Sequence, residues 1–277
     1  MKPIIINNFK KINNIVLFPH CLGQKKLGVE QTPRIIQNYL HPIKNTFFDV
    51  TCKGSLYKNL NYLYHTNKLI ESPKINIGGD HSMAIGSVSS SLCQYPNLKL
   101  IWIDAHADIN TYETSETKNY HGMPLSFLTN LDNNHEFNFI KNTIPLRNIL
   151  YIGIRDLDSY EKYIIKKHNM NVLTVSDIRY SLQDSLMKIT NFINKKPIHI
   201  SLDVDSMDPS VLPCTGTSVY NGFYLNEIIN IIHTLKMENI VNIDFTELNL
   251  VLGTIENSKT SLMNSLTILN ELTDLHT

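Results

Sequence analysis

One stretch of this sequence decides the fold, the run LKLIWIDAHAD from Leu98 to Asp108. Its first half is almost entirely apolar, as expected of a strand that is covered on both faces of a sheet. The run then changes to aspartate and histidine. Short runs rich in Ile, Val, Leu and Phe recur along the chain. We therefore expect eight strands, at Ile15–Phe18, Thr46–Thr51, Lys74–Ile77, Leu98–Asp104, Ile149–Arg155, Asn171–Val175, Pro197–Asp203 and Ile240–Phe245.

Helical patterns lie between these strands. Apolar residues that fit one face of a helix occur at Leu182, Leu186, Ile189 and Ile193, at Leu225, Ile228, Ile229 and Ile232, and at Leu262, Leu266 and Leu269. The alternation predicts an α/β fold of three layers, in which helices cover both faces of a mainly parallel sheet of about eight strands. No repeat or Pro/Gly/Ser-rich linker divides the chain, so we expect residues 1–277 to form one domain, with Thr129–Asn148 as a surface excursion.

The composition is typical of a soluble globular protein. Hydrophobic residues make up 42% and charged residues 18% of the 277 residues, and the formal net charge is zero. A neutral chain gives no argument for a nucleic-acid partner. The longest apolar runs are far shorter than the roughly 20 residues that a membrane helix needs, so we expect no membrane partner.

The cysteines and the first residues bear on the compartment. Cys21, Cys52, Cys93 and Cys214 lie far apart without a CxxC pair, which excludes a zinc knuckle and a thioredoxin motif. We interpret them as free thiols in a reducing compartment. Residues 1–11 have the pattern of neither a secretory signal nor a transit peptide. The sequence therefore predicts a cytoplasmic protein.

Three of the expected strands end in carboxylates and imidazoles. Sites in open α/β sheets form at the carboxyl ends of strands, so these three segments can converge. Residues two apart in an extended chain project to the same side, which lets each segment aim its polar side chains at one centre. The candidate metal ligands are His81, Asp104, His106, Asp108, Asp203 and Asp205.

An alternative is that each motif merely ends its own strand, because Asp and Gly are common in turns and Asp caps helices. That alternative explains any one motif but explains all three together poorly. Four gathered aspartates repel one another and raise each other's pKa unless cations lie among them. Mostly oxygen ligands with two nitrogens suit Mn²⁺ better than structural zinc. Two divalent ions balance the four negative charges and lower the pKa of a bound water.

Four segments resemble the signatures of the ureohydrolase family of arginases, agmatinases and formiminoglutamases: GGDHSMAIGS (78–87), IWIDAHADIN (101–110), HGMPLSFL (121–128) and SLDVDSMDPS (201–210). The similarity extends from Gly28 to the C-terminal helix. It implies an arginase-like fold and two Mn²⁺ ions per chain. By the resemblance, one ion is held by His81, Asp104, Asp108 and Asp203, and the other by Asp104, His106, Asp203 and Asp205. It also implies hydrolysis of L-arginine to L-ornithine and urea by a hydroxide that bridges the ions.

The stretch from Asp108 to His121 resembles that of arginases in its span. In those enzymes, groups at the positions of Asn110, Ser115, Thr117 and Asn119 bind the α-carboxylate of the substrate. Uncharged donors suit this task, directly or through water. The alternative is a polar surface loop, which the same residue types fit equally well.

The segment from Arg155 to Glu161 resembles the arginase segment that recognises the α-ammonium group. The resemblance implies direct contact by Asp158, supported by Asp156 and Glu161. Asp158 or Ser159 can also cap the following helix, and the two roles are compatible. Recognition of both ends of an amino acid favours arginine over agmatine, which lacks the carboxylate.

Three residues are assigned catalytic roles by the resemblance: Glu247, His121 and Asp108. Glu247 corresponds to the carboxylate that orients the guanidinium, and a free carboxylate pairs bidentately with such a cation. His121 corresponds to the proton shuttle, a role that suits the near-neutral pKa of histidine. A lone histidine is more often structural, so this role rests on the HGMP context.

The sequence also departs from the family pattern. Leu250 replaces the usual Pro after Glu-x-Asn, Ser115 and Thr117 exchange the usual order of hydroxyls, and Lys118 replaces a small residue. We expect a homo-oligomer, a trimer by resemblance, without the extended tail that some arginases use in trimer contacts. Two functional alternatives stay open: a ureohydrolase that acts on agmatine or another guanidino or formimino substrate, and a catalytically silent metal-binding homologue.

Overall fold

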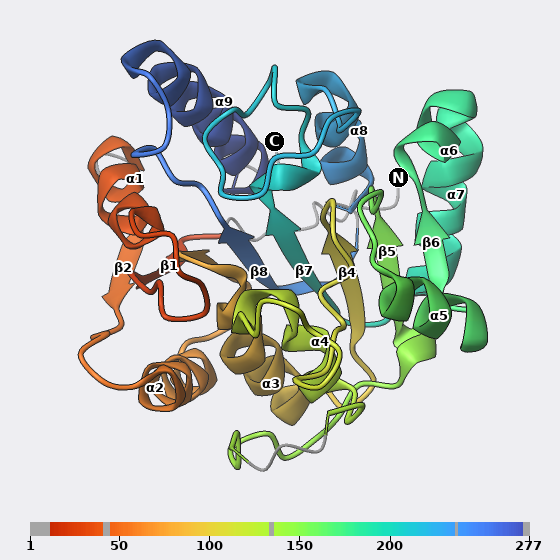
Figure 1. Cartoon of the computed structure of the whole chain (residues 1–277), viewed down its shortest axis with the longest axis horizontal. Helices are drawn as coiled ribbons and strands as arrows, with labels where there is room; N and C mark the ends of the chain where they lie inside the picture. The colour runs from red at the N-terminus through yellow and green to blue at the C-terminus, as the bar shows by residue number, and fades with distance from the viewer. Residues whose placement is uncertain (1–11, 41–44, 133–135, 236–237, 274–277) are drawn as a thin grey trace, which may run out of the picture.

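The computed structural model describes residues 12–40, 45–132, 136–235 and 238–273. Its strands form one sheet in the order β2-β1-β3-β8-β7-β4-β5-β6, and every pairing is parallel (Figure 1). The strands are β1 Asn14–Phe18, β2 Thr46–Asp49, β3 Lys74–Gly78, β4 Lys99–Ile103, β5 Ile149–Ile152, β6 Asn171–Leu173, β7 Ile198–Asp203 and β8 Ile240–Thr246.

All eight predicted strands are present, and the sheet of the described residues is entirely parallel. Several predicted strands run past the real ends. β5 stops at Ile152 instead of Arg155, and β6 stops at Leu173 instead of Val175. The chain turns away from the sheet there, with Gly153 at φ 95° after β5 and Thr174 capping a helix after β6. A glycine with positive φ and a helix-capping threonine thus end these strands earlier than a prediction from composition does.

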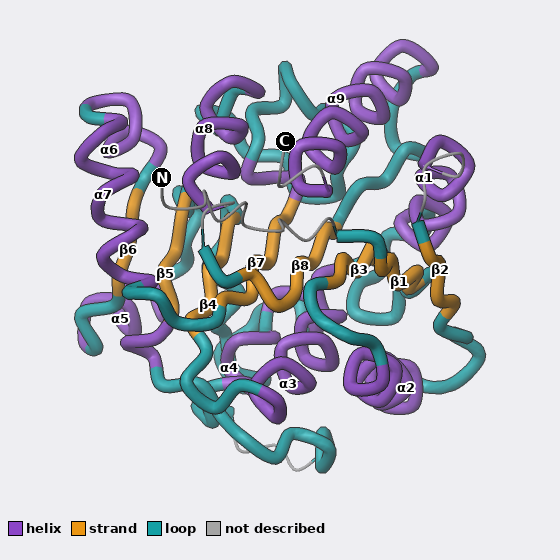
Figure 2. Tube along the Cα trace, turned by 180° about the vertical axis from the view of Figure 1, so that it is seen from behind, coloured by secondary structure: helices purple, strands orange, loops and turns teal. Residues whose placement is uncertain are grey.

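Helices cover both faces of the sheet, as the predicted three-layer fold requires (Figures 1 and 2). One layer contains α1 Thr32–Leu40, α6 Val175–Tyr180, α7 Leu182–Ile193, α8 Leu225–Leu235 and α9 Ile255–Thr273. The other contains α2 Leu56–Leu69, α3 Ala84–Gln94, α4 Pro124–Leu128 and α5 Ser159–Lys167. Short 3₁₀ helices lie at η1 Val29–Gln31, η2 His81–Met83, η3 Tyr120–Gly122, η4 Leu146–Asn148 and η5 Val204–Ser206. The three predicted helical patterns correspond to α7, α8 and α9.

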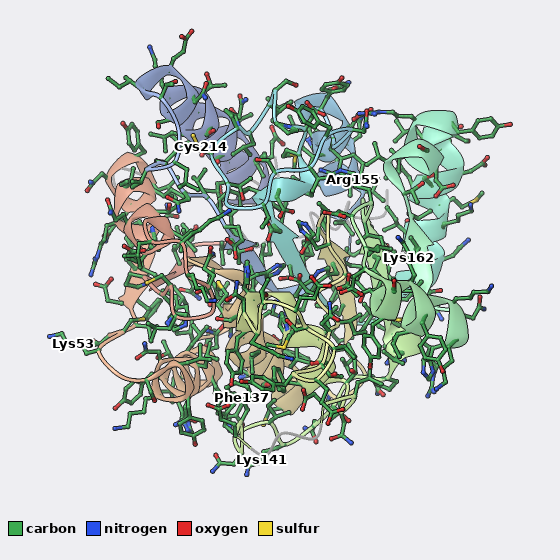
Figure 3. The ribbon with its side chains drawn as sticks, viewed as in Figure 1. Lys53, Phe137, Lys141, Arg155, Lys162 and Cys214 are labelled. Atoms are coloured by element: carbon green, nitrogen blue, oxygen red, sulfur yellow. The ribbon has the colours of Figure 1, made fainter. Side chains whose placement is uncertain are left out.

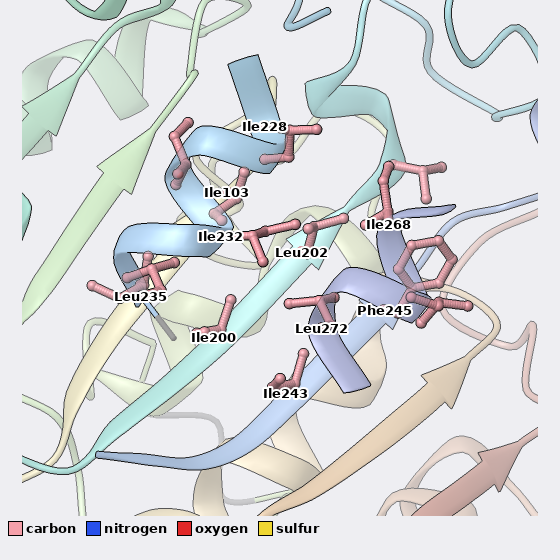
Figure 4. Close-up of a cluster of buried hydrophobic side chains, with 14 of the residues drawn as sticks. Ile103, Ile200, Leu202, Ile228, Ile232, Leu235, Ile243, Phe245, Ile268 and Leu272 are labelled. Carbon is pink, nitrogen blue, oxygen red and sulfur yellow. The ribbon is translucent and has the colours of Figure 1, made fainter. Parts of the chain in front are cut away.

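The two faces of the central strands differ in chemistry. Ile200 and Leu202 of β7 and Phe245 of β8 point toward α8 and α9, where they join a fully buried apolar cluster (Figure 4). Alternate residues face the other way, and His199 and Ser201 of β7 are equally buried there. Burial of apolar area contributes roughly 25 cal/mol per Å², so this cluster stabilises the packing of α8 and α9 on the sheet.

On the other face, a hydrogen-bonded polar network connects α3 with β3, β8 and β7, beside an apolar cluster that α3 forms with β4 and β5. The Asp244 carboxylate accepts from Asn76 Nδ2 at 2.8 Å and lies 3.0 Å from His199 Nε2. His199 Nδ1 lies 2.9 Å from the Ser91 hydroxyl of α3, and Ser91 also accepts from Asn242 Nδ2 at 3.2 Å. Because buried polar groups are costly unless they are paired, the closed network keeps a polar sheet face compatible with burial.

The segment Thr129–Asn148 was expected to be a surface excursion, and this is wrong for its aromatic residues. It has no strand or α-helix among its described residues, but Phe137, Phe139 and Ile144 are buried. Phe137 packs edge-on against Phe127 of α4, with ring centroids 4.9 Å apart (Figure 3). The loop therefore completes the core beneath α4.

In the part of the chain that the structure describes, no helix has the length and hydropathy to span a membrane.

Lys74 at the start of β3 gives the fold a pH-dependent stability. Its buried Nζ donates to the carbonyls of Asn67 and Ile70, both at 2.7 Å, and burial lowers the pKa of Lys74 from 10.5 to about 8. As pH rises, the folded state therefore releases this proton before the unfolded state does. The unfolded state binds more protons between these two pKa values, so the Lys74 contribution to the free energy of unfolding increases from pH about 8 to 10.5.

Urea unfolding at a series of pH values tests this. We expect the stability of the wild type relative to Lys74→Met to increase across that window. Lys162→Met, which changes an exposed lysine, is the matched control and keeps the wild-type pH dependence. A difference between the wild type and Lys74→Met that does not change with pH would contradict the assignment.

Candidate metal centre and active site

The candidate site lies at the carboxyl ends of five adjacent strands, β3, β8, β7, β4 and β5. The predicted residues follow these strands directly: His81 after β3, Glu247 after β8, Asp203 and Asp205 at the end of β7, Asp104, His106 and Asp108 after β4, and Asp156 and Asp158 after β5. Segments that are far apart in the sequence thus meet because their strands are neighbours in a parallel sheet.

His81 lies at the centre of the first group of ligands. Its Nδ1 is 3.1 Å from Asp104 Oδ2, 3.1 Å from Asp108 Oδ2 and 3.2 Å from Asp203 Oδ2. The other ring nitrogen, Nε2, lies 2.8 Å from the Ser201 hydroxyl. The ring stacks on Trp102, with centroids 4.1 Å apart and planes within 8°. These two contacts fix the ring so that Nδ1 points at the carboxylates.

His106 organises the second group. Its Nδ1 lies 3.0 Å from Asp205 Oδ2 and 3.5 Å from Asp104 Oδ1. Asp205 is held in turn by the Ala105 N–H, which donates to Oδ1 at 3.2 Å, and by the Thr217 hydroxyl, which donates to Oδ2 at 2.9 Å. Asp104 therefore belongs to both groups of candidate ligands.

The two groups have the chemistry of a binuclear metal site. His81, Asp104 and Asp203 offer ligand atoms within 4.8 Å of one another, and so do Asp104, His106 and Asp205. His81 Nδ1 and Asp104 Oδ2 are buried and lack a hydrogen-bond partner among the described residues. Buried polar atoms are rarely left in this state, and cations between them would satisfy both.

The electrostatics support the same fit. Burial alone would lower the pKa of an imidazole, but the neighbouring carboxylates outweigh burial and raise the pKa of His81 and of His106. Burial, with the charges of Asp205 and Asp104, raises the pKa of Asp203. Burial, with the Asp104 charge, raises the pKa of Asp108 to about 6. The cluster thus favours positive charge in its centre, which divalent ions bound by oxygen and nitrogen ligands supply.

Two of the predicted residues have left-handed backbones. Asp108 has φ 48° and Glu247 has φ 67°, values that non-glycine residues adopt at a cost. In both cases the local turn directs a carboxylate into the site instead of continuing along the strand direction. Asp108 also accepts the Leu125 N–H at its carbonyl, which ties this turn to α4.

Glu247 and His121 form a buried pair beside the first group. The Glu247 Oε1 atom accepts from the His81 N–H at 2.8 Å and lies 3.0 Å from His121 Nδ1. Gln24 Nε2 donates to Oε2 at 2.7 Å. Burial alone would lower the pKa of His121, but the Glu247 charge outweighs it and raises this pKa to about 9.

A pocket of about 290 Å³ opens above the cluster. Its lining includes most of the predicted substrate residues but neither Asn119 nor Glu247: His106, Asp108, Asn110, Ser115, Glu116, Thr117, His121, Gly122, Asp156, Asp158, Glu161, Asp203, Asp205 and Thr217. Ser115 Oγ accepts the Lys118 N–H, and Thr117 Oγ1 accepts the Asn119 N–H. Each hydroxyl accepts a backbone hydrogen and keeps its own hydrogen for a ligand.

Asp158 is the N-cap of α5, the second role that the sequence predicted for it. It forms a capping box with Glu161, and its Oδ2 accepts from Asn110 Nδ2 at 2.6 Å. Asp158 thereby joins the two segments predicted to bind the ends of the substrate. Burial raises the pKa of Glu161 to about 7, and the nearby Asp108 charge adds to the shift. His106 Nε2 lies 3.8 Å from Asp156 at the pocket.

Two of the unusual residues leave the site undisturbed. Lys118 has φ 58°, and its Nζ donates to the carbonyls of Tyr112 and Glu113 instead of lining the pocket. Leu250 packs against the apolar core, and its carbonyl accepts the Ser258 hydroxyl at 2.7 Å. The turn that carries Glu247 is therefore anchored without a proline.

Sequence reasoning missed three residues that support the site. Ser201 orients His81, Gln24 binds Glu247, and Thr217 binds Asp205. Gln24 and Thr217 lie outside the four quoted motifs, and Ser201 is the first residue of SLDVDSMDPS. Ser201 alone had a local signal, since it lies two residues before Asp203 on the same face of β7.

Comparison with known proteins agrees with this geometry. The sequence model of the arginase family matches residues 17–271. An arginase of Glaciozyma antarctica is 39% identical over 237 residues, 82% of this chain and 64% of that protein, so the chain spans less than two thirds of its length. An arginase of Staphylococcus aureus is 34% identical over 275 residues, 87% of this chain and 90% of that protein.

Solved structures give the same result. An Entamoeba histolytica arginase in complex with L-ornithine matches with a TM-score of 0.87 and 25% identity over 95% of this chain and 99% of that one. A Bacillus subtilis arginase matches with a TM-score of 0.86 and 28% identity over 96% and 99%. Since the matched region contains every residue of the two ligand groups, the chain belongs to the arginase family.

Proposed function

We propose that this protein is a manganese-dependent arginase, which hydrolyses L-arginine to L-ornithine and urea. The observation that carries the proposal is the pair of ligand groups sharing Asp104 at the base of a pocket. Membership of the arginase family supports the same activity. The acidic lining suits a substrate that carries two cationic groups.

We assign two Mn²⁺ ions to the cluster. His81, Asp104, Asp108 and Asp203 would hold one ion, and Asp104, His106, Asp203 and Asp205 the other. When bound, such a pair supplies Lewis-acid charge and lowers the pKa of water to near neutrality. The carboxylates contribute four negative charges, which two divalent cations neutralise.

We assign the orientation of the guanidinium to Glu247, which contacts His121 of the pocket lining. Its carboxylate is 1% exposed and is fixed by the His81 N–H and the Gln24 amide, so it is held in place before substrate binds. Arg side chains and carboxylates pair bidentately in proteins, and the substrate guanidinium has the same shape. His121 Nδ1 lies 3.0 Å from Glu247 Oε1, and the protonated imidazole would deliver a proton to the leaving amine.

The outer pocket would bind the amino-acid end of the substrate. Ser115 and Thr117 would donate their free hydroxyl hydrogens to the α-carboxylate, with Asn110 and Asn119 in support. Asp158 would accept the α-ammonium group, aided by Asp156 and Glu161. Hydrogen bonding between Asn110 and Asp158 keeps the two recognition elements in register.

A second candidate substrate is agmatine, which carries an ammonium group and no carboxylate. One observation favours it: the pocket lining contains Glu116, Asp156, Asp158 and Glu161 but no lysine or arginine. Other guanidino or formimino substrates fit less well, because they lack the second cation. A catalytically silent metal-binding homologue would bind manganese without releasing urea.

Three properties complete the proposal. Residues 1–277 would act as a single domain, which the one continuous sheet supports. The protein would work in the cytoplasm, which the four free cysteines support. It would form a homotrimer, which rests on family resemblance.

Substrate choice is tested by urea release from arginine and agmatine after manganese loading, with metal content measured on the same sample. We expect higher kcat/KM for arginine, because only arginine uses both ends of the pocket. Ser115→Ala should raise KM for arginine and leave agmatine turnover unchanged. Equal or better turnover of agmatine by the wild type would reject the carboxylate assignment, and no urea from either would identify a silent homologue.

His121 is tested by His121→Asn. Loss of a positioned proton donor typically costs 10²–10⁴-fold, so we expect kcat to fall by at least about 10² with manganese content unchanged. Parallel metal analysis and turnover measurements separate the two effects. Full activity in the variant would rule out the proton-shuttle role.

Asp203 is tested by Asp203→Asn, which removes a carboxylate predicted to contact both ions. Manganese should raise the melting temperature of the wild type, because a ligand that binds only the folded state stabilises it. The variant should lose this rise, while its metal-free form melts higher than the metal-free wild type, since one repulsive charge is gone. A variant that keeps the full manganese-induced rise would contradict the assignment.

A further inference from the structure

Arg155 binds backbone carbonyls around the second ligand group. Its Nη2 donates to Asp205 O at 2.8 Å and to Val219 O at 2.8 Å, and its Nε donates to Tyr220 O at 3.1 Å. Longer bonds of 3.1 to 3.3 Å complete the set, to the carbonyls of Gly153, Ser206 and Met207. Figure 3 shows Arg155 beside the loop that precedes α8.

This guanidinium has an unusual set of partners. In the described part of the chain no carboxylate forms an ion pair with it, although arginines at sites commonly pair with acids. Its donors instead bind the Gly153 carbonyl after β5, carbonyls at the end of η5 and at Met207, and two carbonyls of the loop 208–222. Carbonyl oxygens at the end of a helix need hydrogen-bond donors. One planar guanidinium with five N–H bonds can donate to several of them.

The contacts of Arg155 converge on Asp205. The guanidinium binds the Asp205 carbonyl directly, and through Val219 it holds the loop whose Thr217 hydroxyl donates to Asp205 Oδ2. On the other side, the Arg155 N–H donates to Ala105 O at 2.8 Å, and the Ala105 N–H donates to Asp205 Oδ1. The backbone and both carboxylate oxygens of Asp205 are thus connected to Arg155.

The first ligand group has separate supports. His81 is oriented by Ser201 and Trp102, and the His81 N–H binds Glu247. None of these residues contacts Arg155. Loss of the Arg155 contacts should therefore disturb one side of the cluster more than the other.

We propose that Arg155 is a positioning residue that holds Asp205 in place for the second metal ion and leaves the first ion largely unaffected. This inference rests on the proposed two-ion function. Supporting residues outside the ligand set typically change metal affinity by about 10 to 100-fold when they are removed. We expect a loss of that size for the second ion alone.

The test compares Arg155→Met with Arg179→Met. Arg179 is the matched control, because it binds the far end of the same loop through Gly222 O at 2.8 Å and pairs with Glu227, without contacting Asp205. Manganese binding is measured by equilibrium dialysis on the full chain, and electron paramagnetic resonance distinguishes a coupled ion pair from single ions. Melting temperatures of the metal-free proteins report any general loss of stability.

We expect the wild type and Arg179→Met to bind two ions and give a coupled spectrum. Arg155→Met should bind one ion with near wild-type affinity and the second about 10 to 100-fold more weakly, with a single-ion spectrum at low manganese. Arg155→Lys, which keeps the charge but has one donor nitrogen, should fall between them and serves if the methionine variant does not fold. Thr217→Val should weaken the same ion.

The outcomes are distinguishable. If the Arg155 variants bind both ions like the wild type, or lose both equally, the positioning role is overturned and the two-ion proposal stands. If Arg179→Met weakens the second ion as much as Arg155→Met, the effect belongs to the loop and the role of Arg155 is overturned. If the wild type itself binds fewer than two ions, the proposed function fails and this inference fails with it.

Discussion

Repulsion among the buried carboxylates is the constraint on which the rest of this site depends. Asp104, Asp108, Asp203 and Asp205 lie at the ends of two hydrogen-bonded strands, β4 and β7, so the parallel sheet itself brings their charges together. Backbone N–H groups and two imidazoles offset only part of that charge. The remaining charge favours cations in the cluster, and the contacts around His81 and Asp205 hold the candidate ligand atoms toward its centre.

The fold separates stability from chemistry. The α8–α9 face of the central strands is apolar, whereas the α3 face combines an apolar cluster against β4 and β5 with a polar network on β3, β8 and β7. Left-handed backbones at Asp108 and Glu247 add local strain at the same edge. Such strain persists only where the surrounding structure is well packed. Leu248 beside Glu247 belongs to the α8–α9 cluster, and Ala107 and Ile109 beside Asp108 belong to the cluster on the α3 side.

Residues whose own side chains form the candidate site were predictable from the sequence. Residues that only hold those side chains in place were not. Apolar runs located every strand of the described residues, and the spacing of aspartate and histidine at the strand ends identified six residues that the structure brings together in one cluster. Helix α3 had no amphipathic pattern, because it is buried all round and its serines bond to carbonyls and to the polar network. Arg155 was assigned only as part of a recognition segment, since its contacts with Val219 and Asp205 depend on tertiary structure. The burial of Phe137 was likewise not predictable, because the segment around it is polar in sequence.

The two edge strands of the sheet, β2 and β6, affect how readily copies of this chain could join edge to edge. β2 has four residues and β6 has three, so each edge presents few unpaired backbone groups to another chain. Arg34 and Asp49 add a charged pair at the β2 edge, 2.9 Å apart. Short, charged edges are poor templates for strand addition. Contacts between copies of this chain are therefore left to helices and loops, and fibrils that grow by extending the native sheet are disfavoured.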